Sequence, residues 1–296
     1  MSSRPLGVTT GGRQQDDAPS VETPSGKDTA YENFPVGSWL LPAPLRPSVA
    51  VYYAFARAID DISDNPTLSA ADKVDRLDGF ADALLGRGGD APGYEKAHTM
   101  RRCLDERGIT PDHCLDLVAA FKQDATKLRY RDWDDLLGYC ILSAAPVGRF
   151  LLDLHGGSRH GYGPADALCM ALQVINHLQD CRDDYQALDR VYLPLDWMAA
   201  EGATVADLGR DRCTPAMRAV IDRTLDATEG LLHEARPLPA GLASRRLAME
   251  SAAILDIAWS LVRRLRRGDP LATRIQLSKA AYAWCCIRGA TAALFR

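Results

Sequence analysis

Residues 53–64 read YAFARAIDDISD, and residues 173–184 read QVINHLQDCRDD. In the first stretch, the polar positions that repeat at i, i+4, i+7 and i+11 are Tyr53, Arg57, Asp60 and Asp64. At 3.6 residues per turn these positions share one narrow stripe of a helix, and Asp61 lies about 70° from its middle. The flanking residues are apolar, so we expect a mostly buried helix in which ionised carboxylates need cations or hydrogen bonds.

The second stretch repeats this pattern at i, i+3, i+7 and i+11, with Gln173, Asn176, Asp180 and Asp184. Asp183 falls at the edge of this stripe, on the side of Asn176. One pair of aspartates at i, i+4 is weak evidence, because such pairs often lie on solvated helix faces. Two stripes of equal length on two apolar helices favour a shared site.

Mg²⁺ is the cation that best fits this pattern. It prefers hard oxygen ligands and is usually held by a few carboxylates together with substrate phosphates. Carboxylates that face each other repel, which raises their pKa values unless cations offset the charge. We therefore expect Asp60, Asp64, Asp180 and Asp184 to hold Mg²⁺ against a diphosphate, with Asp61 and Asp183 supporting them from the side. Such ions stabilise a leaving diphosphate.

The remaining sequence predicts an all-α fold. Ala and Leu are abundant, and Pro and Gly fall between long stretches of helical periodicity. Residues 1–28 are polar and are predicted to form a disordered tail, and residues 29–296 to form one helical domain. A first helix is expected from about Pro47 to Asn65-Pro66. Further helices are expected over about 69–85, 93–107, 112–129, 133–155, 165–187, 214–236, 242–267 and 277–294.

Charge and cysteine content narrow the function. The net charge of −4, from 35 basic and 39 acidic residues, gives no indication of the strongly basic surface that a nucleic-acid partner requires, so we expect no such partner. The eight cysteines form no CxxC pair, which favours reduced thiols and a cytoplasmic protein. A basic run at Arg263, Arg264, Arg266 and Arg267 favours a helix C-terminus over membrane or phosphate contact. No uninterrupted run of roughly 20 apolar residues occurs, so peripheral contact with the inner face of a membrane is the closest membrane association we expect.

The sequence leaves two interpretations open for several side chains. Tyr139, Ser143, Ala144, Val147 and Gly148 are predicted on one helix, where small residues either leave room for a prenyl chain or allow close helix packing. Phe34 and Tyr53 are either core residues or faces that stabilise a cation. His177 and Cys181 have the spacing of zinc ligands, but no second pair matches. No nucleotide-binding motif is present.

The two stretches, followed by RVYLP at residues 190–194, resemble the squalene and phytoene synthase family in order and in their separation of about 120 residues. The resemblance covers nearly the whole chain beyond the tail. It implies a single-domain, isoprenoid-synthase-type helical bundle with a central substrate cavity. The segments ENFPV (32–36), SAAPVG (143–148) and NHLQDC (176–181) are most similar to the hopanoid-pathway branch of the family.

The resemblance implies a reaction and a set of roles. Presqualene diphosphate would be ionised with Mg²⁺ and rearranged, and water would capture the cation to give hydroxysqualene without NADPH. Arg57 and Asn176 would bind the diphosphate, and Asn33, Phe34 and Gly148 the rest of the substrate. The reacting centre or its water would be served by Tyr53, Tyr139 and Gln173. The enzymes before and after this step are the partners with which functional coupling would be expected.

Two alternatives stay open. One is condensation of two farnesyl or geranylgeranyl diphosphates to presqualene diphosphate, squalene or phytoene. Two-step relatives carry Ser-x-Ser-Phe where this chain has Tyr31-Glu32-Asn33-Phe34, and Gly-Arg where it has Asp189-Arg190. The other is a non-catalytic assembly protein on the same fold.

Overall fold

The computed structural model describes residue 21 and residues 41–157 and 161–294, with side chains up to residue 291. The predicted tail, apart from Val21, and the predicted site residues Asn33 and Phe34 lie outside the described residues. The boundary at residue 28 therefore stays a prediction.

Helices make up most of the described chain, which confirms the all-α fold class. The α-helices are α1 (Arg46–Ser63), α2 (Ala70–Leu84), α3 (Glu95–Arg107), α4 (Asp112–Asp124), α5 (Trp133–Ser143), α6 (Ala145–Leu154), α7 (Tyr162–Leu188), α8 (Leu195–Glu201), α9 (Pro215–Ala235), α10 (Leu238–Gly241), α11 (Arg245–Arg267) and α12 (Lys279–Leu294). Short 3₁₀ helices cover Ala43–Leu45 and Val205–Gly209, and the strands are β1 (Arg129–Tyr130) and β2 (Val191–Pro194).

Local sequence explains where several helices begin and end. Ser69 and Asp72 form a capping box at the start of α2. The hydroxyls of Thr214 and Ser244 accept hydrogen bonds from backbone N–H groups at the starts of α9 and α11. Gly108 ends α3 in the left-handed conformation that glycine adopts without strain.

The predicted helix over 133–155 is wrong in one respect, because it is two helices. The chain breaks at Ala144, whose φ of −121° and ψ of −45° depart from helical values. Pro146 has no N–H to bond the Leu142 carbonyl, and its ring disfavours a continuous helix there. Small residues of α5 and α6 therefore turn toward the interior at the break.

The segment Trp133–Leu154 is, among the described residues, long and apolar enough by composition to cross a membrane, with a mean hydropathy of 1.3. Its break at Ala144 and the burial of Leu136 and Phe150 in the interior are typical of core helices. Helices α5 and α6 therefore belong to the core of the fold.

The predicted helix over 112–129 was also wrong at its end, because α4 stops at Asp124. The chain then turns and forms β1, which pairs in parallel with β2 through Arg129 opposite Val191 and Tyr130 opposite Pro194. This pairing fixes the segment after α7 beside the first helices of the chain.

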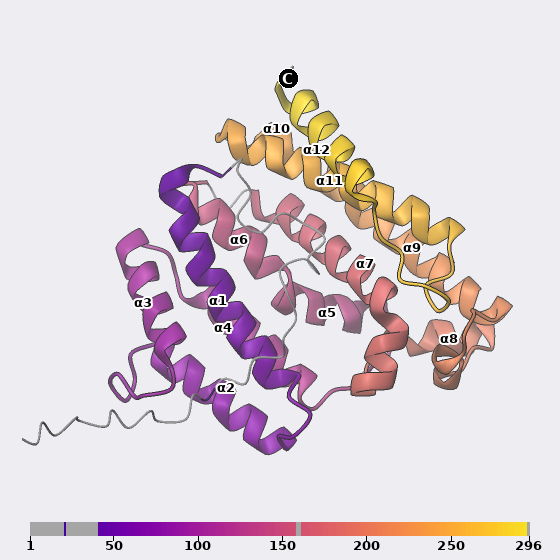
Figure 1. Cartoon of the computed structure of the whole chain (residues 1–296), viewed down its shortest axis with the longest axis horizontal. Coiled ribbons are helices and arrows are strands. Elements are labelled where there is room, and N and C mark those ends of the chain that lie inside the picture. The colour runs from indigo at the N-terminus through magenta and orange to yellow at the C-terminus, as the bar shows by residue number, and fades with distance from the viewer. Residues whose placement is uncertain (1–20, 22–40, 158–160, 295–296) are drawn as a thin grey trace, which may run out of the picture.

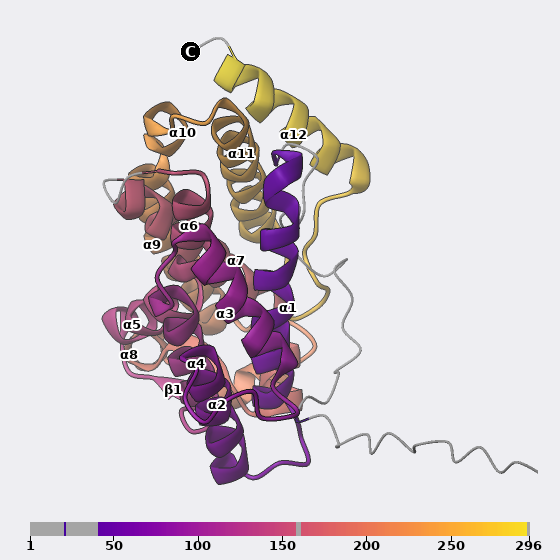
Figure 2. The ribbon, with the colours of Figure 1, turned by 90° about the vertical axis from the view of Figure 1, so that its left-hand side faces the viewer.

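The helices pack around two buried apolar clusters. One cluster is built mainly from α1–α4 with part of α6, and includes Phe55 and Phe80. The other is built mainly from α5, α7, α9 and α11, and includes Leu172 and Leu261. Figure 1 shows α1–α4 on one side, α5–α7 in the middle, and α9, α11 and α12 on the other side. Figure 2 shows α12 at the edge of the molecule, where it packs against α11.

Candidate active site

A cavity lies where the two apolar clusters meet. It encloses about 1390 Å³ of empty space, including the solvent at its mouth, and its lining is predominantly apolar. Its wall comes from α1, α5, α6, α7, α10 and α11. Four predicted site residues line it: Tyr53, Gly148, Gln173 and Asn176.

Gly148 lets α6 approach α7 closely at this wall. A Cβ atom at Gly148 would lie 2.8 Å from Sγ of Cys169, which is closer than real Cβ atoms come to other atoms. Both interpretations of the small residues therefore apply here, since Gly148 permits tight helix packing and also lines the cavity.

The two polar stripes begin at this cavity and leave it in the same direction. Tyr53, the first residue of the α1 stripe, lines the cavity. Gln173 and Asn176, the first two residues of the α7 stripe, also line it. At the far end, Arg190, which follows α7, contacts Asp64, which follows α1. The two helices thus run parallel, as Figure 1 shows, and both sets of aspartates lie toward their C-terminal ends.

On α1, each stripe aspartate lies beside an arginine. Arg57 lies 3.3 Å from Asp60 and 3.2 Å from Asp61, and Asp61 is buried. Arg190 Nη1 donates to Asp64 Oδ1 at 2.6 Å. Its Nη2 donates to the carbonyl and hydroxyl oxygens of Ser63. Fixed positive charge therefore balances these carboxylates.

On α7, the arrangement is similar but more open. Arg274 donates two hydrogen bonds to the Asp180 carboxylate, from Nε to Oδ1 at 2.5 Å and from Nη2 to Oδ2 at 3.0 Å. Asp184 lies 4.0 Å from Nδ1 of His177. Asp183 is exposed.

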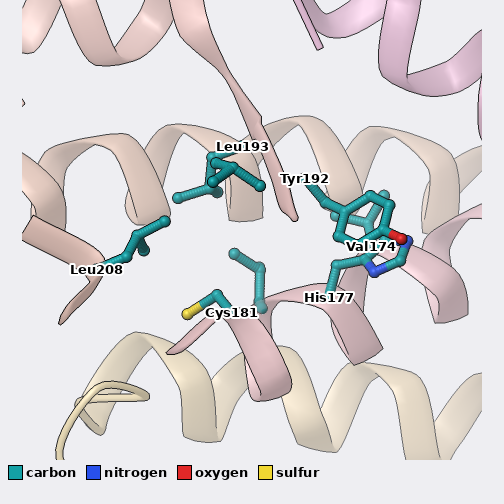
Figure 3. A pocket seen from close by; sticks show the side chains of 8 residues that line it. Val174, His177, Cys181, Tyr192, Leu193 and Leu208 are labelled. Carbon is teal, nitrogen blue, oxygen red and sulfur yellow. The ribbon is translucent and has the colours of Figure 1, made fainter. Parts of the chain in front are cut away.

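His177 connects the cavity wall to a buried polar network. Its Nε2 lies 3.2 Å from the amide nitrogen of Gln173, and its ring stacks on Tyr192 with centroids 3.6 Å apart. Figure 3 shows the two rings face to face. Burial first, and then the charge of Arg190, lower the pKa of His177 to about 3, so its imidazole is neutral at physiological pH.

Tyr139 points into this network and is absent from the residues that line the cavity. Its hydroxyl donates to Asp124 at 2.7 Å, and the hydroxyl of Tyr192 donates to the same carboxylate at 2.9 Å. Burial raises the pKa of Asp124 to about 6, although Arg190 and the two hydroxyls act in the opposite direction. The predicted role of Tyr139 at the reacting centre stays a prediction, while its observed contact is with Asp124.

Sequence reasoning placed Arg57 beside Asp60 but missed Arg190 and Arg274, the partners of Asp64 and Asp180. Arg190 stands in the quoted RVYLP segment, so its position beside the second stripe offered a signal. Arg274 offered none, because it lies in the connection between α11 and α12, 94 residues from Asp180. Glu250, on α11, lines the cavity and is nearly fully buried. A single glutamate in a helix gave no signal of this environment.

The carboxylates suit Mg²⁺ by their chemistry, since they are hard oxygen donors on two helices that share a cavity. Within residue 21 and the ranges 41–157 and 161–294, no group of three or more His, Cys, Asp or Glu side chains is arranged to hold a metal ion. The Mg²⁺ site stays a prediction.

A helical fold around an apolar cavity, with acidic stripes leading out of it, defines the class of isoprenoid-diphosphate enzymes. The chain belongs to the squalene/phytoene synthase family, which it matches over residues 28–281.

Individual members of this family with similar sequences or structures narrow the comparison. The chain is 46% identical over 256 residues to a hydroxysqualene synthase of Rhodopseudomonas palustris, covering 86% of this chain and 87% of that protein. It is 42% identical over 258 residues to a hydroxysqualene synthase of Zymomonas mobilis, covering 86% of each. The crystal structure of squalene synthase HpnC from Alicyclobacillus acidocaldarius matches with a TM-score of 0.68 and 30% identity, over 78% of this chain and 87% of that one.

Proposed function

We propose that this chain is a hydroxysqualene synthase, which converts presqualene diphosphate and water to hydroxysqualene and diphosphate. The observation that carries the proposal is the 46% identity to a hydroxysqualene synthase over 86% of the chain. The cavity at the start of the two stripes supports it, because its predominantly apolar lining suits a prenyl chain and the polar side chains of Gln173 and Asn176 stand where the stripe of α7 begins.

The polar end would bind the leaving group. Arg57 and Asn176 lie on the two stripes, next to the first aspartates, and supply a guanidinium and an amide for diphosphate oxygens. Mg²⁺ held by Asp60, Asp64, Asp180 and Asp184, together with the diphosphate, would neutralise the charge that develops as the C–O bond breaks. Arg190 and Arg274 would hold these carboxylates in place before substrate arrives.

The apolar part would shelter the carbocation. Ionisation breaks the C–O bond and leaves a cation that must rearrange before water reaches it. The ring of Tyr53 lines the cavity and offers an aromatic face to positive charge. The Gln173 amide, positioned by His177, is the polar group at the boundary between the two parts.

Product analysis tests the proposal directly. Purified protein is incubated with Mg²⁺ and presqualene diphosphate, without NADPH, and the C30 products are identified by mass spectrometry. Hydroxysqualene and one equivalent of diphosphate are the expected products. Release of diphosphate without a hydroxylated C30 product would contradict the proposal.

A second arm supplies farnesyl diphosphate alone. The description of the Alicyclobacillus structure as a squalene synthase makes this arm necessary. Formation of a C30 product would favour the condensing enzyme over the lyase. If neither substrate reacted and Asp60→Ala or Asp180→Ala left binding of both unchanged, the assembly-protein alternative would stand.

A further inference from the structure

A carboxyl group lies in the apolar part of the cavity, away from the two aspartate stripes. Glu250 on α11 is 5% exposed and lines the cavity with Leu247, Ser251 and Ile254. Its Oε2 atom has no hydrogen-bond partner among the described residues. A buried polar atom without a partner is rare in native proteins and points to a missing ligand or water.

The environment of Glu250 disfavours its charge. Burial raises the pKa of its carboxyl to about 7. A carboxyl group with this pKa exists in both protonation states near neutral pH, which is the condition under which a general base is most effective.

Two further polar atoms on the cavity wall lack partners among the described residues: the hydroxyls of Tyr52 and Ser143. A water molecule is stable in a mostly apolar cavity only where two to four polar groups receive it. The cavity wall therefore carries three side chains with a buried polar atom that lacks a partner among the described residues, and of these three Glu250 can take up a proton near neutral pH.

We propose that Glu250 is a catalytic residue that holds the capturing water and accepts its proton. This inference depends on the proposed function. The water oxygen forms a C–O bond with the carbocation, and one of its protons passes to the Glu250 carboxylate. The products are the alcohol and a neutral carboxyl group, which returns the proton to solvent when product leaves.

The test measures the share of alcohol among all C30 products made from presqualene diphosphate. Glu250→Gln keeps the size of the side chain but cannot accept the proton, so the alcohol share is expected to fall at least fivefold in favour of elimination products. Glu250→Asp keeps a carboxyl group and is expected to retain more of the alcohol share than Glu250→Gln. Glu234→Gln, at an exposed glutamate of α9, is the matched control.

The share of alcohol does not depend on the amount of folded protein, so a loss of stability alone would not change it. An unchanged share in Glu250→Gln overturns this inference and leaves the proposed function intact. If the wild-type protein releases diphosphate without making the alcohol, both fail. If Glu250→Gln does not fold, Glu250→Met, which has a similar size and no proton acceptor, replaces it, and an alcohol share equal to that of the wild type would then contradict the inference.

An independent observation concerns the outer surface of α11 and α12. Trp284 and Ile287 on α12 are 62% and 59% exposed. Trp284 lines a shallow hollow together with Arg263, Arg264 and Arg267 of α11, whose side chains are also exposed. Among the described residues, Arg263 donates a hydrogen bond to the hydroxyl of Ser260 and Arg264 donates one to the carbonyl of Gln276. No carboxylate in this part of the chain forms an ion pair with either guanidinium.

We infer that this surface, defined by Arg263, Arg264, Arg267, Trp284 and Ile287, docks on a membrane that contains anionic phospholipid. Tryptophan is favoured at the level of the lipid headgroups, and nearby arginines attract anionic lipid. Arg266, by contrast, pairs with Asp226 and Glu229 of α9 and acts within the fold. The basic run thus has two separate roles.

Co-sedimentation of the full chain with vesicles tests this surface. Binding to phosphatidylcholine vesicles that contain phosphatidylglycerol is expected to exceed binding to pure phosphatidylcholine, and to weaken in high salt. Combined Arg263→Ala, Arg264→Ala and Arg267→Ala, or Trp284→Ser, should reduce it at least tenfold. Leu128→Ser with Arg131→Ala, at exposed positions elsewhere, is the control. Equal binding to both vesicles, or no loss in the variants, would overturn the inference.

Discussion

Asp180 and Asp183 lie three residues apart on α7 but differ in surroundings. Asp180 is half-buried and held by Arg274, whereas Asp183 is exposed at the edge of the stripe. If Asp180 is a metal ligand, Asp180→Ala should lower turnover of presqualene diphosphate at least 100-fold, and Asp183→Ala less than 10-fold. Initial rates over a range of Mg²⁺ concentrations measure both. Equal losses would contradict the ranking that the stripe predicts.

Helical periodicity predicted the aspartates but could not predict their partners. The positions of Asp64 and Asp180 follow from 3.6 residues per turn, which is local information. Arg190 is 126 residues from Asp64, and its contact depends on the parallel course of α1 and α7 and on the pairing of β1 with β2. The sequence predicted where the aspartates lie, whereas the fold determines which basic side chains pair with them.

Glu250 also gives a stability prediction. Between about pH 4.5 and 7 its carboxyl is protonated in the folded state and ionised in the unfolded state. The folded state therefore binds the extra proton, and the free energy of unfolding contributed by this group falls as pH rises through that window. Tyr282 on α12, the titratable neighbour, has a pKa raised by burial to about 12 and stays protonated throughout.

Glu250→Gln removes this titration. The variant should therefore gain stability over the wild type as pH rises from 5 to 8, by at most about 3 kcal/mol. Urea denaturation at both pH values measures the difference, and Glu234→Gln should show none. A gain of equal size at pH 5 and pH 8 would show that the pKa of Glu250 is not raised in the folded protein.

At the scale of elements, the break between α5 and α6 is a feature that helical periodicity did not predict. Apolar periodicity continues across residues 133–155 and predicts one helix, but Pro146 interrupts the hydrogen bonding and α6 takes a new direction. Ser143, Ala144, Val147 and Gly148 then line one wall together. The small residues were visible in the sequence, whereas the bend that gathers them was not.

Gly148 allows a direct test of this wall. Gly148→Val places a branched side chain against Cys169, so we expect a loss of about 1–3 kcal/mol in the free energy of unfolding through overpacking. Adding Cys169→Ala removes the clashing Sγ atom and should recover much of that loss. Thermal or urea unfolding of the two single variants and the double variant measures the coupling. Simple additivity of the two effects would contradict the close contact between α6 and α7.

For the whole molecule, the cavity lies where two apolar clusters meet, and α6 contributes residues to both clusters. Helical periodicity predicted an all-α chain, but the central cavity was predicted only through the resemblance to a family, because periodicity does not specify which helices adjoin. The structure explains why the cavity is tolerated. Residues of both clusters form its wall, and the polar stripes of α1 and α7 could not pack in a fully apolar interior.

A ligand that spans this cavity should therefore bind both clusters and stabilise the folded protein as a unit. Farnesyl thiodiphosphate, which ionises slowly, at about 100 times its dissociation constant should add about 2.7 kcal/mol, or raise Tm by roughly 5–10 °C. Because the aspartates and the diphosphate are proposed to share Mg²⁺, the rise should require both compounds and disappear in Asp180→Ala. Differential scanning fluorimetry with each component alone supplies the controls. A full rise without Mg²⁺ would mean that the arginines bind the diphosphate unaided, and the aspartates would then need another role.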